Sequence, residues 1–279
     1  MQNHPQQAAH SAIAPTKSFT INAAHTLTIK SPLVPQFEKR GLKHPITQRQ
    51  ASLMAEAYCV AGQWQAATDC FEQLITGSAS FPSEHLLMRA VEIAQKAARL
   101  NEAFSWQKQL AFSKPFEATV WLKLAQLAED TDQLDVAKTY YQRTIKRDDE
   151  CLEAWFGLGV VSEKQEAYDT AKLYYEALLA INPDWLPALN NWAGCCMQLG
   201  CYDEAQEGFS RVLNLMPQYP KAILGLGITL DFSGQHRSAC VYYGQYLRLK
   251  PVSSHSEFVR ERLNELEAER FTASSVAKR

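Results

Sequence analysis

Three cysteines stand close together in the second half of the chain, at Cys195, Cys196 and Cys201. Thiolates ligate metals, but a structural zinc site needs spaced pairs of ligands, with a second pair elsewhere. Cys195 and Cys196 are adjacent, so on a helix their side chains would point about 100° apart. None of the seven histidines stands at ligand spacing from a cysteine or a glutamate. We therefore predict no metal site and no other cofactor.

Residues that could carry out catalysis are not arranged in a known spacing either. No glycine-rich phosphate loop follows a strand pattern, and no serine stands in a nucleophile elbow. The aromatic residues fall at helix-packing positions, which favours a core over a stacking platform for nucleic-acid bases. We therefore predict that the chain is not an enzyme and has no catalytic residues.

The residues that do recur at fixed spacing belong to helices. Between Trp155 and Pro251 one pattern appears three times with a period of 34 residues: Trp-x2-Leu-Gly, then Ala-x3-Tyr or Phe, then Pro. The three copies contain Trp155, Leu158, Gly159, Ala171, Tyr175 and Pro183; Leu189, Trp192, Ala193, Ala205, Phe209 and Pro217; and Ile223, Leu226, Gly227, Ala239, Tyr243 and Pro251. This order resembles the tetratricopeptide repeat family, in which each repeat is a helix–turn–helix.

The resemblance implies an all-α fold, a right-handed alpha-solenoid of six tetratricopeptide repeats. One helix pair cannot bury its apolar face alone, so neighbouring repeats must stack. Gly62 is expected to end a helix in the left-handed conformation, and Ser83 to cap the next helix. Followed back along the chain, the register gives repeats at 48–81, 84–117, 118–151, 152–185, 186–219 and 220–253.

The segment before the repeats differs in composition. Residues 1–46 hold five prolines and show no helical periodicity, so we predict a disordered tail. Thr26–Ile29 alternates weakly and could pair as a strand, although it is too short to stand alone. The alternative is that Phe19–Phe37 docks on a partner or in the protein's own groove.

The segment after the repeats predicts one further helix. Ser254 and Glu257 have the spacing of a capping box, and residues 254–270 carry an apolar stripe with charged residues on the other faces. This pattern favours a helix that caps the last repeat, with a dimerisation helix as the alternative. Residues 271–279 are expected to fray.

Composition and charge exclude several classes of function. A net charge of −2 gives no bulk basic field for nucleic acid. The sequence contains no run of about 18 apolar residues, so no membrane span is predicted, and the start of the chain does not resemble a secretory signal. Seven cysteines without a disulfide-framework spacing favour free thiols and a cytoplasmic protein.

In the tetratricopeptide family the first helices of successive repeats line a concave surface, and positions not used for packing face it. The resulting candidate peptide-binding groove consists of Leu122, Lys123, Gln126, Phe156, Val160, Asn190, Asn191, Met197, Lys221, Leu224, Ile228 and Phe232. Its apolar members could form a strip, and the two asparagines could hydrogen-bond an extended peptide backbone. Gly157, Gly194 and Gly225 are expected to open the groove floor. The alternative is that curvature closes the groove, so that these residues pack against one another.

Some tetratricopeptide domains clamp the two carboxylates of chaperone C-termini with five lysine, asparagine and arginine residues. Asn191 and Lys221 fit two of these places, but Phe156, Val160 and Gly225 occupy the other three. The clamp is therefore broken, and a peptide of apolar or mixed character, or a partner helix, is the better prediction.

The resulting hypothesis is a non-enzymatic scaffold or adaptor that binds a peptide or helix of another protein. Alternatives are a bacterial secretion or assembly chaperone, a regulatory partner of a separate enzyme, and a self-assembling scaffold. No contact with nucleic acid and no membrane insertion are expected, and a homo-oligomer is possible.

Overall fold

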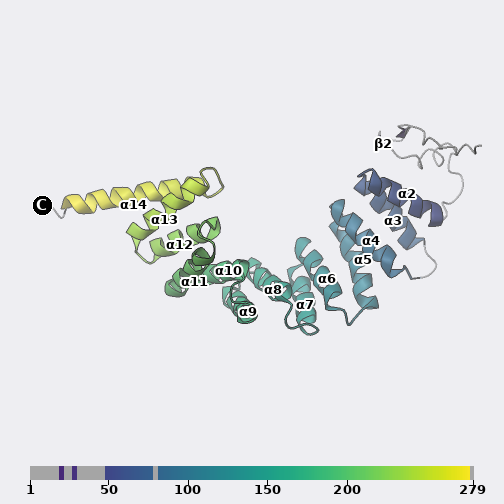
Figure 1. Ribbon diagram of the computed structural model, residues 1–279, viewed down its shortest axis with the longest axis horizontal. Coiled ribbons are helices and arrows are strands. Elements are labelled where there is room, and N and C mark those ends of the chain that lie inside the picture. The colour runs from purple at the N-terminus through teal and green to yellow at the C-terminus, as the bar shows by residue number, and fades with distance from the viewer. Residues whose placement is uncertain (1–18, 22–26, 30–47, 78–80, 277–279) are drawn as a thin grey trace, which may run out of the picture. The chain divides into compact units, whose positions relative to one another are not determined.

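The computed structural model describes residues 19–21, 27–29, 48–77 and 81–276, with side chains over residues 51–77 and 81–268 (Figure 1). Two short strands, β1 (Phe19–Ile21) and β2 (Leu27–Ile29), pair antiparallel with Phe19 opposite Ile29. The weak alternation near Thr26 therefore does belong to a strand. The rest of the predicted tail, and residues 277–279 of the predicted frayed end, lie outside the described residues.

Helices make up the remainder, and they divide into two compact units, residues 1–114 and 115–279. The first unit contains α2 (Gln48–Val60), α3 (Trp64–Thr76), α4 (Glu84–Lys96) and α5 (Leu100–Ser113). The second contains α6 (Ala118–Asp130), α7 (Leu134–Ile145), α8 (Leu152–Lys164), α9 (Tyr168–Ile181), α10 (Leu186–Gln198), α11 (Tyr202–Leu215), α12 (Pro220–Phe232), α13 (His236–Leu249) and α14 (Ser256–Val276). Within each unit, each helix packs against the next one along the chain, so the fold is an all-α helical repeat.

The turn inside each helix pair repeats one backbone conformation. A residue with positive φ stands between the two helices of every pair, at Gly62, Ala98, Asp132, Glu166, Gly200 and Gly234. The amide of the following residue donates to a carbonyl near the end of the first helix, as in Gln63 to Tyr58 at 2.9 Å. Glycine reaches this left-handed region without strain, which explains the predicted cap at Gly62.

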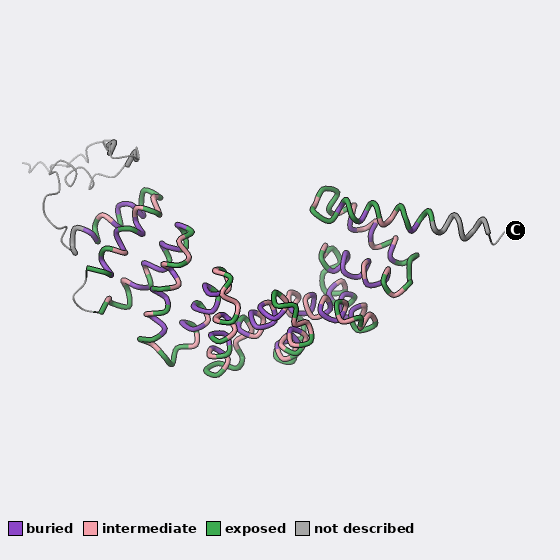
Figure 2. Tube along the Cα trace, turned by 180° about the vertical axis from the view of Figure 1, so that it is seen from behind, coloured by how far each residue is buried: buried purple, intermediate pink, exposed green. Residues whose placement is uncertain are grey.

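Buried residues recur along the helices from α2 to α14 wherever two of them face each other (Figure 2). In the second unit, one aromatic ring of each second helix packs against a first helix. The Tyr175 ring lies so close to Gly159 that an added Cβ would come within 2.4 Å of it. The small residue of the repeat pattern is therefore needed for this close approach of α8 and α9.

The helix ends agree with the sequence analysis at one place and differ at another. Ser83 Oγ accepts from the Leu86 amide at 3.3 Å, as predicted for the cap of α4. The predicted capping box from Ser254 to Glu257 is wrong, because α14 begins only at Ser256. There the Ser256 hydroxyl donates to the Lys250 carbonyl at 2.7 Å, which fixes the start of α14 against the end of α13.

The apolar stripe of α14 packs on the chain itself. Val259 and Leu266 are 0% and 4% exposed and belong to the same core cluster as Tyr243 and Tyr246 of α13, with Leu263 packed against it. This burial favours the capping role over dimerisation, since the stripe is already covered. Over the residues that the structure describes, no helix combines the length and apolar character needed to cross a membrane.

Candidate functional site

A cavity of about 510 Å³ opens between first helices of the second unit. Helix α10 supplies half of the residues that line it, and α10 contacts α9, α11 and α12. The lining residues are Val160, Glu163 and Lys164 of α8, Tyr168 of α9, Asn190, Asn191, Gly194, Cys195, Met197 and Gln198 of α10, Phe209 of α11, and Lys221 of α12. Figure 1 shows α8, α10 and α12 following one another along this unit.

One glycine accounts for the open space. A Cβ added to Gly194 would meet no atom within 4 Å. Gly157 and Gly225 were expected to open the groove in the same way, but this is wrong. An added Cβ would come within 2.2 Å of the Tyr141 ring at Gly157, and within 2.4 Å of the Phe209 ring at Gly225. Aromatic rings of the preceding repeats therefore fill both positions, and α10 alone keeps its glycine open.

The two asparagines form a hydrogen-bonded chain along the cavity wall. Asn190 Nδ2 donates to Asn191 Oδ1 at 3.3 Å, and Asn191 Nδ2 donates to the Tyr175 hydroxyl at 3.2 Å. Asn190 is 9% exposed, and its Oδ1 accepts no hydrogen bond within the part of the chain that the structure describes. A buried amide oxygen without a donor is costly, so this wall has an unused acceptor.

An acidic side chain completes the polar part of the cavity. Glu163 receives hydrogen bonds from the Tyr175 hydroxyl and from Cys195, whose Sγ lies 3.7 Å from Glu163 Oε1. Burial raises the pKa of Glu163, and these hydrogen bonds and the positive charge of Lys221 only partly oppose that rise. The carboxylate is therefore less well stabilised than one in water.

Two lysines lie at the rim of the cavity. Lys164 Nζ is held 2.9 Å from Glu129 Oε1. Lys221 is exposed, and it takes part in no ion pair among the residues whose side chains are described. The cavity therefore combines an amide chain, one partly buried acid and one available cation, which suits a ligand that carries both donors and acceptors.

The structure brings together five of the twelve predicted groove residues: Val160, Asn190, Asn191, Met197 and Lys221. The other seven do not line this cavity. Phe156 packs against the Trp185 ring, with centroids 5.3 Å apart, and Leu224 is a 9% exposed member of the core. Ile228 packs against the same core, and Phe232 is 70% exposed and stacks on Tyr202. Leu122, Lys123 and Gln126 lie on α6, away from the cavity.

Glu163 is not among the twelve residues predicted to form the groove, although its position on a first helix faces the predicted concave surface. A signal was available, since acids recur at Glu129, Glu163 and Asp231 of the first helices. Twelve residues after each acid stands a tyrosine, and two of these hydroxyls donate to their acid at 2.8 and 3.2 Å. In the fifth repeat, Met197 and Phe209 replace this pair, which makes that repeat different from its neighbours.

Two of the three neighbouring cysteines are buried thiols. Cys195 and Cys196 are 1% and 0% exposed, and burial raises the pKa of both thiols, to about 12 for Cys196. Protonated thiols are poor ligands and poor nucleophiles. Within the described residues, no group of three or more His, Cys, Asp or Glu side chains could hold a metal ion.

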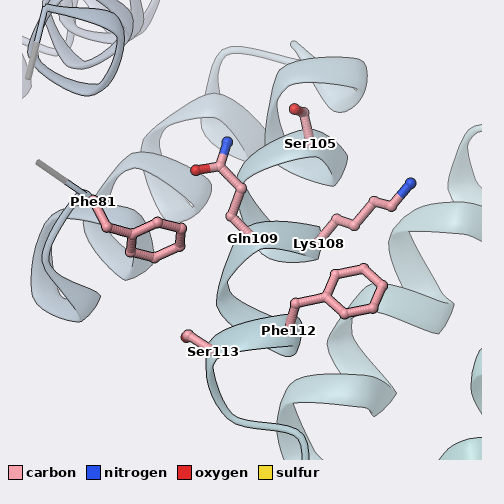
Figure 3. Close-up of a pocket in the computed structure, with 6 residues that line it drawn as sticks. All are labelled: Phe81, Ser105, Lys108, Gln109, Phe112 and Ser113. Atoms are coloured by element: carbon pink, nitrogen blue, oxygen red, sulfur yellow. The ribbon is translucent and has the colours of Figure 1, made fainter. Parts of the chain in front are cut away.

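The first unit has a separate pocket of about 550 Å³ on the outer face of α5 (Figure 3). Phe81, which approaches from the segment ahead of α4, and Phe112 of α5 line it, together with Lys108, Gln109 and the hydroxyl-bearing Ser105 and Ser113. Phe81 and Phe112 are 66% and 57% exposed. This pocket lacks a buried polar group with an unused hydrogen-bonding site, so the α8–α10–α12 cavity is the stronger candidate.

Comparison with known proteins agrees with this architecture. Residues 122–184 match the family model described as tetratricopeptide repeat. Among solved structures, YrrB, described as a tetratricopeptide repeat protein with an unusual peptide-binding site, has 16% identity and a TM-score of 0.56, over 70% of this chain and 99% of its own. MamA from Desulfovibrio magneticus RS-1, residues 41 to the end, has 16% identity and a TM-score of 0.58, over 61% and 97%.

A second MamA crystal structure has 16% identity and a TM-score of 0.56, over 63% of this chain and 94% of its own. A search of curated proteins returned no match. At these identities the structural likeness establishes the fold, and the family match adds the repeat type. Residues 122–184 are therefore similar to the tetratricopeptide repeat family, and the solved structures show that the chain has the same kind of helical repeat fold.

Proposed function

We propose that the chain is a non-enzymatic interaction scaffold, and that it binds an extended peptide segment of a partner protein in the α8–α10–α12 cavity. The observation that carries this proposal is the amide chain of Asn190 and Asn191 beside the open space at Gly194. A side-chain amide both donates and accepts, so it can pair with the N–H and C=O groups of one peptide unit.

The geometry around the amides supports an extended ligand. A glycine without a neighbour lets a ligand backbone approach α10 closely, as at other glycine-lined sites. Val160, Met197 and Phe209 offer apolar surface beside the amides, and burial of apolar surface contributes about 25 cal/mol per Å² before ordering costs. The description of YrrB as a peptide-binding protein supports the same use of the fold.

The seven cysteines support a reducing compartment for this role. All are free thiols, and four of them are buried. Cytoplasmic proteins keep such thiols reduced, whereas secreted proteins of this cysteine content usually contain disulfides. We propose a cytoplasmic partner protein, and the net charge of −2 gives no reason to propose nucleic acid.

The test is selection of binders from a library of displayed random peptides, followed by affinity measurement with the purified chain. Gly194→Leu places a side chain in the open space, and we expect it to weaken the selected peptides by about tenfold or more, or ~1.4 kcal/mol.

Gly244→Leu is the matched control, because a Cβ on Gly244 of α13 meets only Arg248 Nη1, at 3.9 Å, and lies outside the cavity. It should bind as the wild type does. Selected peptides that bind Gly194→Leu and wild type equally would show that the cavity is not the peptide site.

A further inference from the structure

Three first helices of the second unit carry an acid at the same repeat position, Glu129, Glu163 and Asp231, and two of these acids pair with a cation from the second helix along the chain. Glu129 of α6 pairs with Lys164 of α8, 35 residues later, at 2.9 Å. Asp231 of α12 pairs with Arg262 of α14, 31 residues later, through Nε at 2.7 Å and Nη2 at 3.0 Å. The chain thus contains two ion pairs in which an acid at this repeat position binds a cation from a later helix.

Glu163 of α8 is the equivalent acid of the fourth repeat, and both cation positions are vacant there. The residue 35 positions later is Gln198, and the residue 31 positions later is Gly194. Both line the cavity, and the space above Gly194 is open to at least 4 Å. Glu163 makes no ion pair with any side chain that the structure describes. A partly buried carboxylate without a cation is less favourable than a paired one, and its two equivalents are both paired.

We infer that the cavity receives a cationic side chain, lysine or arginine, of the bound peptide, and that Glu163 is its acceptor. This inference rests on the proposed function, since it names the chemistry of the ligand for the same cavity. The ligand's cation takes the place that Lys164 and Arg262 occupy at Glu129 and Asp231. The amides of Asn190 and Asn191 then pair with the peptide backbone on either side.

The charges around the cavity are consistent with a cationic ligand group beside Glu163. Lys164 is engaged by Glu129, so it does not neutralise Glu163. Lys221 also lines the cavity and lowers the pKa of Glu163 by its charge, but it forms no ion pair with Glu163. A ligand carboxylate near Glu163 would meet a like charge. An acidic group of the peptide would instead fit beside Lys221. The preferred peptide therefore has a basic residue that contacts Glu163.

The direct test uses pools of short, end-blocked peptides in which one central position is fixed as arginine, lysine, citrulline, norleucine or glutamate. Citrulline keeps the shape of arginine without its charge. Wild type should bind the arginine and lysine pools about tenfold more tightly than the citrulline and norleucine pools, as expected for a hydrogen bond between charged groups. Glu163→Gln keeps the size of the side chain, and should remove this preference.

Gln198→Lys provides an independent variant that should fold normally. It recreates the Glu129–Lys164 arrangement, so the new lysine should occupy Glu163 and abolish the preference for the basic pools. Gln198→Met is its matched control, with similar length and no charge, and should retain the preference. Thermal unfolding of all variants checks that binding changes are not caused by loss of structure.

The outcomes separate the inference from the proposed function. If all pools bind wild type equally, and Gly194→Leu still weakens them, the cavity binds peptides but the cation site is refuted. If the glutamate pool binds best and Lys221→Met removes that binding, an acidic ligand is correct and the inference is again overturned. If no selected or pooled peptide responds to Gly194→Leu, the proposed function itself fails.

Discussion

Substituting alanine at Gly225 tests why the groove is closed at one first helix and open at another. The added Cβ of Gly225→Ala would lie 2.4 Å from Phe209 Cζ and 2.6 Å from Cε1. Ordinary carbon contacts are about 3.5–4.0 Å long, so the ring must move by about 1 Å. Phe209 is 3% exposed within the core, which leaves it little room to do so. Overpacking of this kind costs about 1–3 kcal/mol, and alanine regains about 1 kcal/mol in a helix, so we expect a net loss of up to about 2 kcal/mol.

Gly194→Ala is the matched control for this prediction. It makes the same substitution in the preceding first helix, where the new Cβ meets nothing within 4 Å. It should therefore gain up to about 1 kcal/mol from helix propensity alone. The gain in helix propensity is common to both variants, so they should differ by the overpacking cost alone, about 1–3 kcal/mol.

Urea denaturation followed by circular dichroism measures the difference, with the slope of the transition checked for each variant because repeat arrays do not always unfold in one step. The double variant Gly225→Ala, Phe209→Leu replaces the ring by a smaller side chain and should recover part of the lost stability. A double-mutant cycle would quantify this recovery. If Gly225→Ala is as stable as Gly194→Ala, Phe209 does not close the groove at Gly225, and our account of the open cavity at α10 is wrong.

Three further predictions concern other positions in the two units. Ala98→Gly should stabilise the first unit by about 0.5–1 kcal/mol, because alanine has φ of 56° in a turn where glycine is unstrained, and an unchanged urea midpoint would contradict this. Ser83→Ala should cost about 1 kcal/mol in the same assay, because the Leu86 amide loses its cap, whereas Ser83→Asp should not. Burial opposes ionisation of Asp231, but hydrogen bonds from Arg262 outweigh it and hold its pKa below the ordinary value. Because the folded pKa is lowered, this carboxylate stabilises the second unit above about pH 3.9, and that contribution is lost as the pH falls further. Asp231→Asn should therefore lower stability at neutral pH and flatten its decline in acid, and an unchanged acid limb would refute the assignment.

The period of 34 residues was sufficient to predict the helical repeat, because each helix pair buries its own small and aromatic residues. Gly159 and Tyr175 show this, since both the residue types and their close contact follow from the pattern. The same spacing could not predict what covers Gly157 and Gly225. Those positions meet rings from the preceding repeat, and that contact depends on how repeats stack rather than on the pattern within one.

Some predicted groove residues line the cavity and others are buried in the core, and the stacking of neighbouring repeats again decides which. Asn190 and Asn191 were predicted from their chemistry and from their place on a first helix, and they do line the cavity. Leu224 has the same kind of position, yet it is 9% exposed in the core, so an aspartate there would test folding and not binding. Burial at such positions is set by the neighbouring repeat, which a single sequence pattern does not describe.

The cavity lies where the fifth repeat departs from the regularities that hold in its neighbours. Met197 and Phe209 replace the acid and tyrosine, and Gly194 and Gln198 stand where cations would reach the preceding acid. None of these changes weakens the stacking itself, because Phe209 still packs against Gly225 as Tyr141 packs against Gly157. The departures instead leave a carboxylate without a cation, beside a hollow and an amide chain. Residues that keep the period hold the array together, so the residues that break it are available for binding, and in this chain they meet at one place.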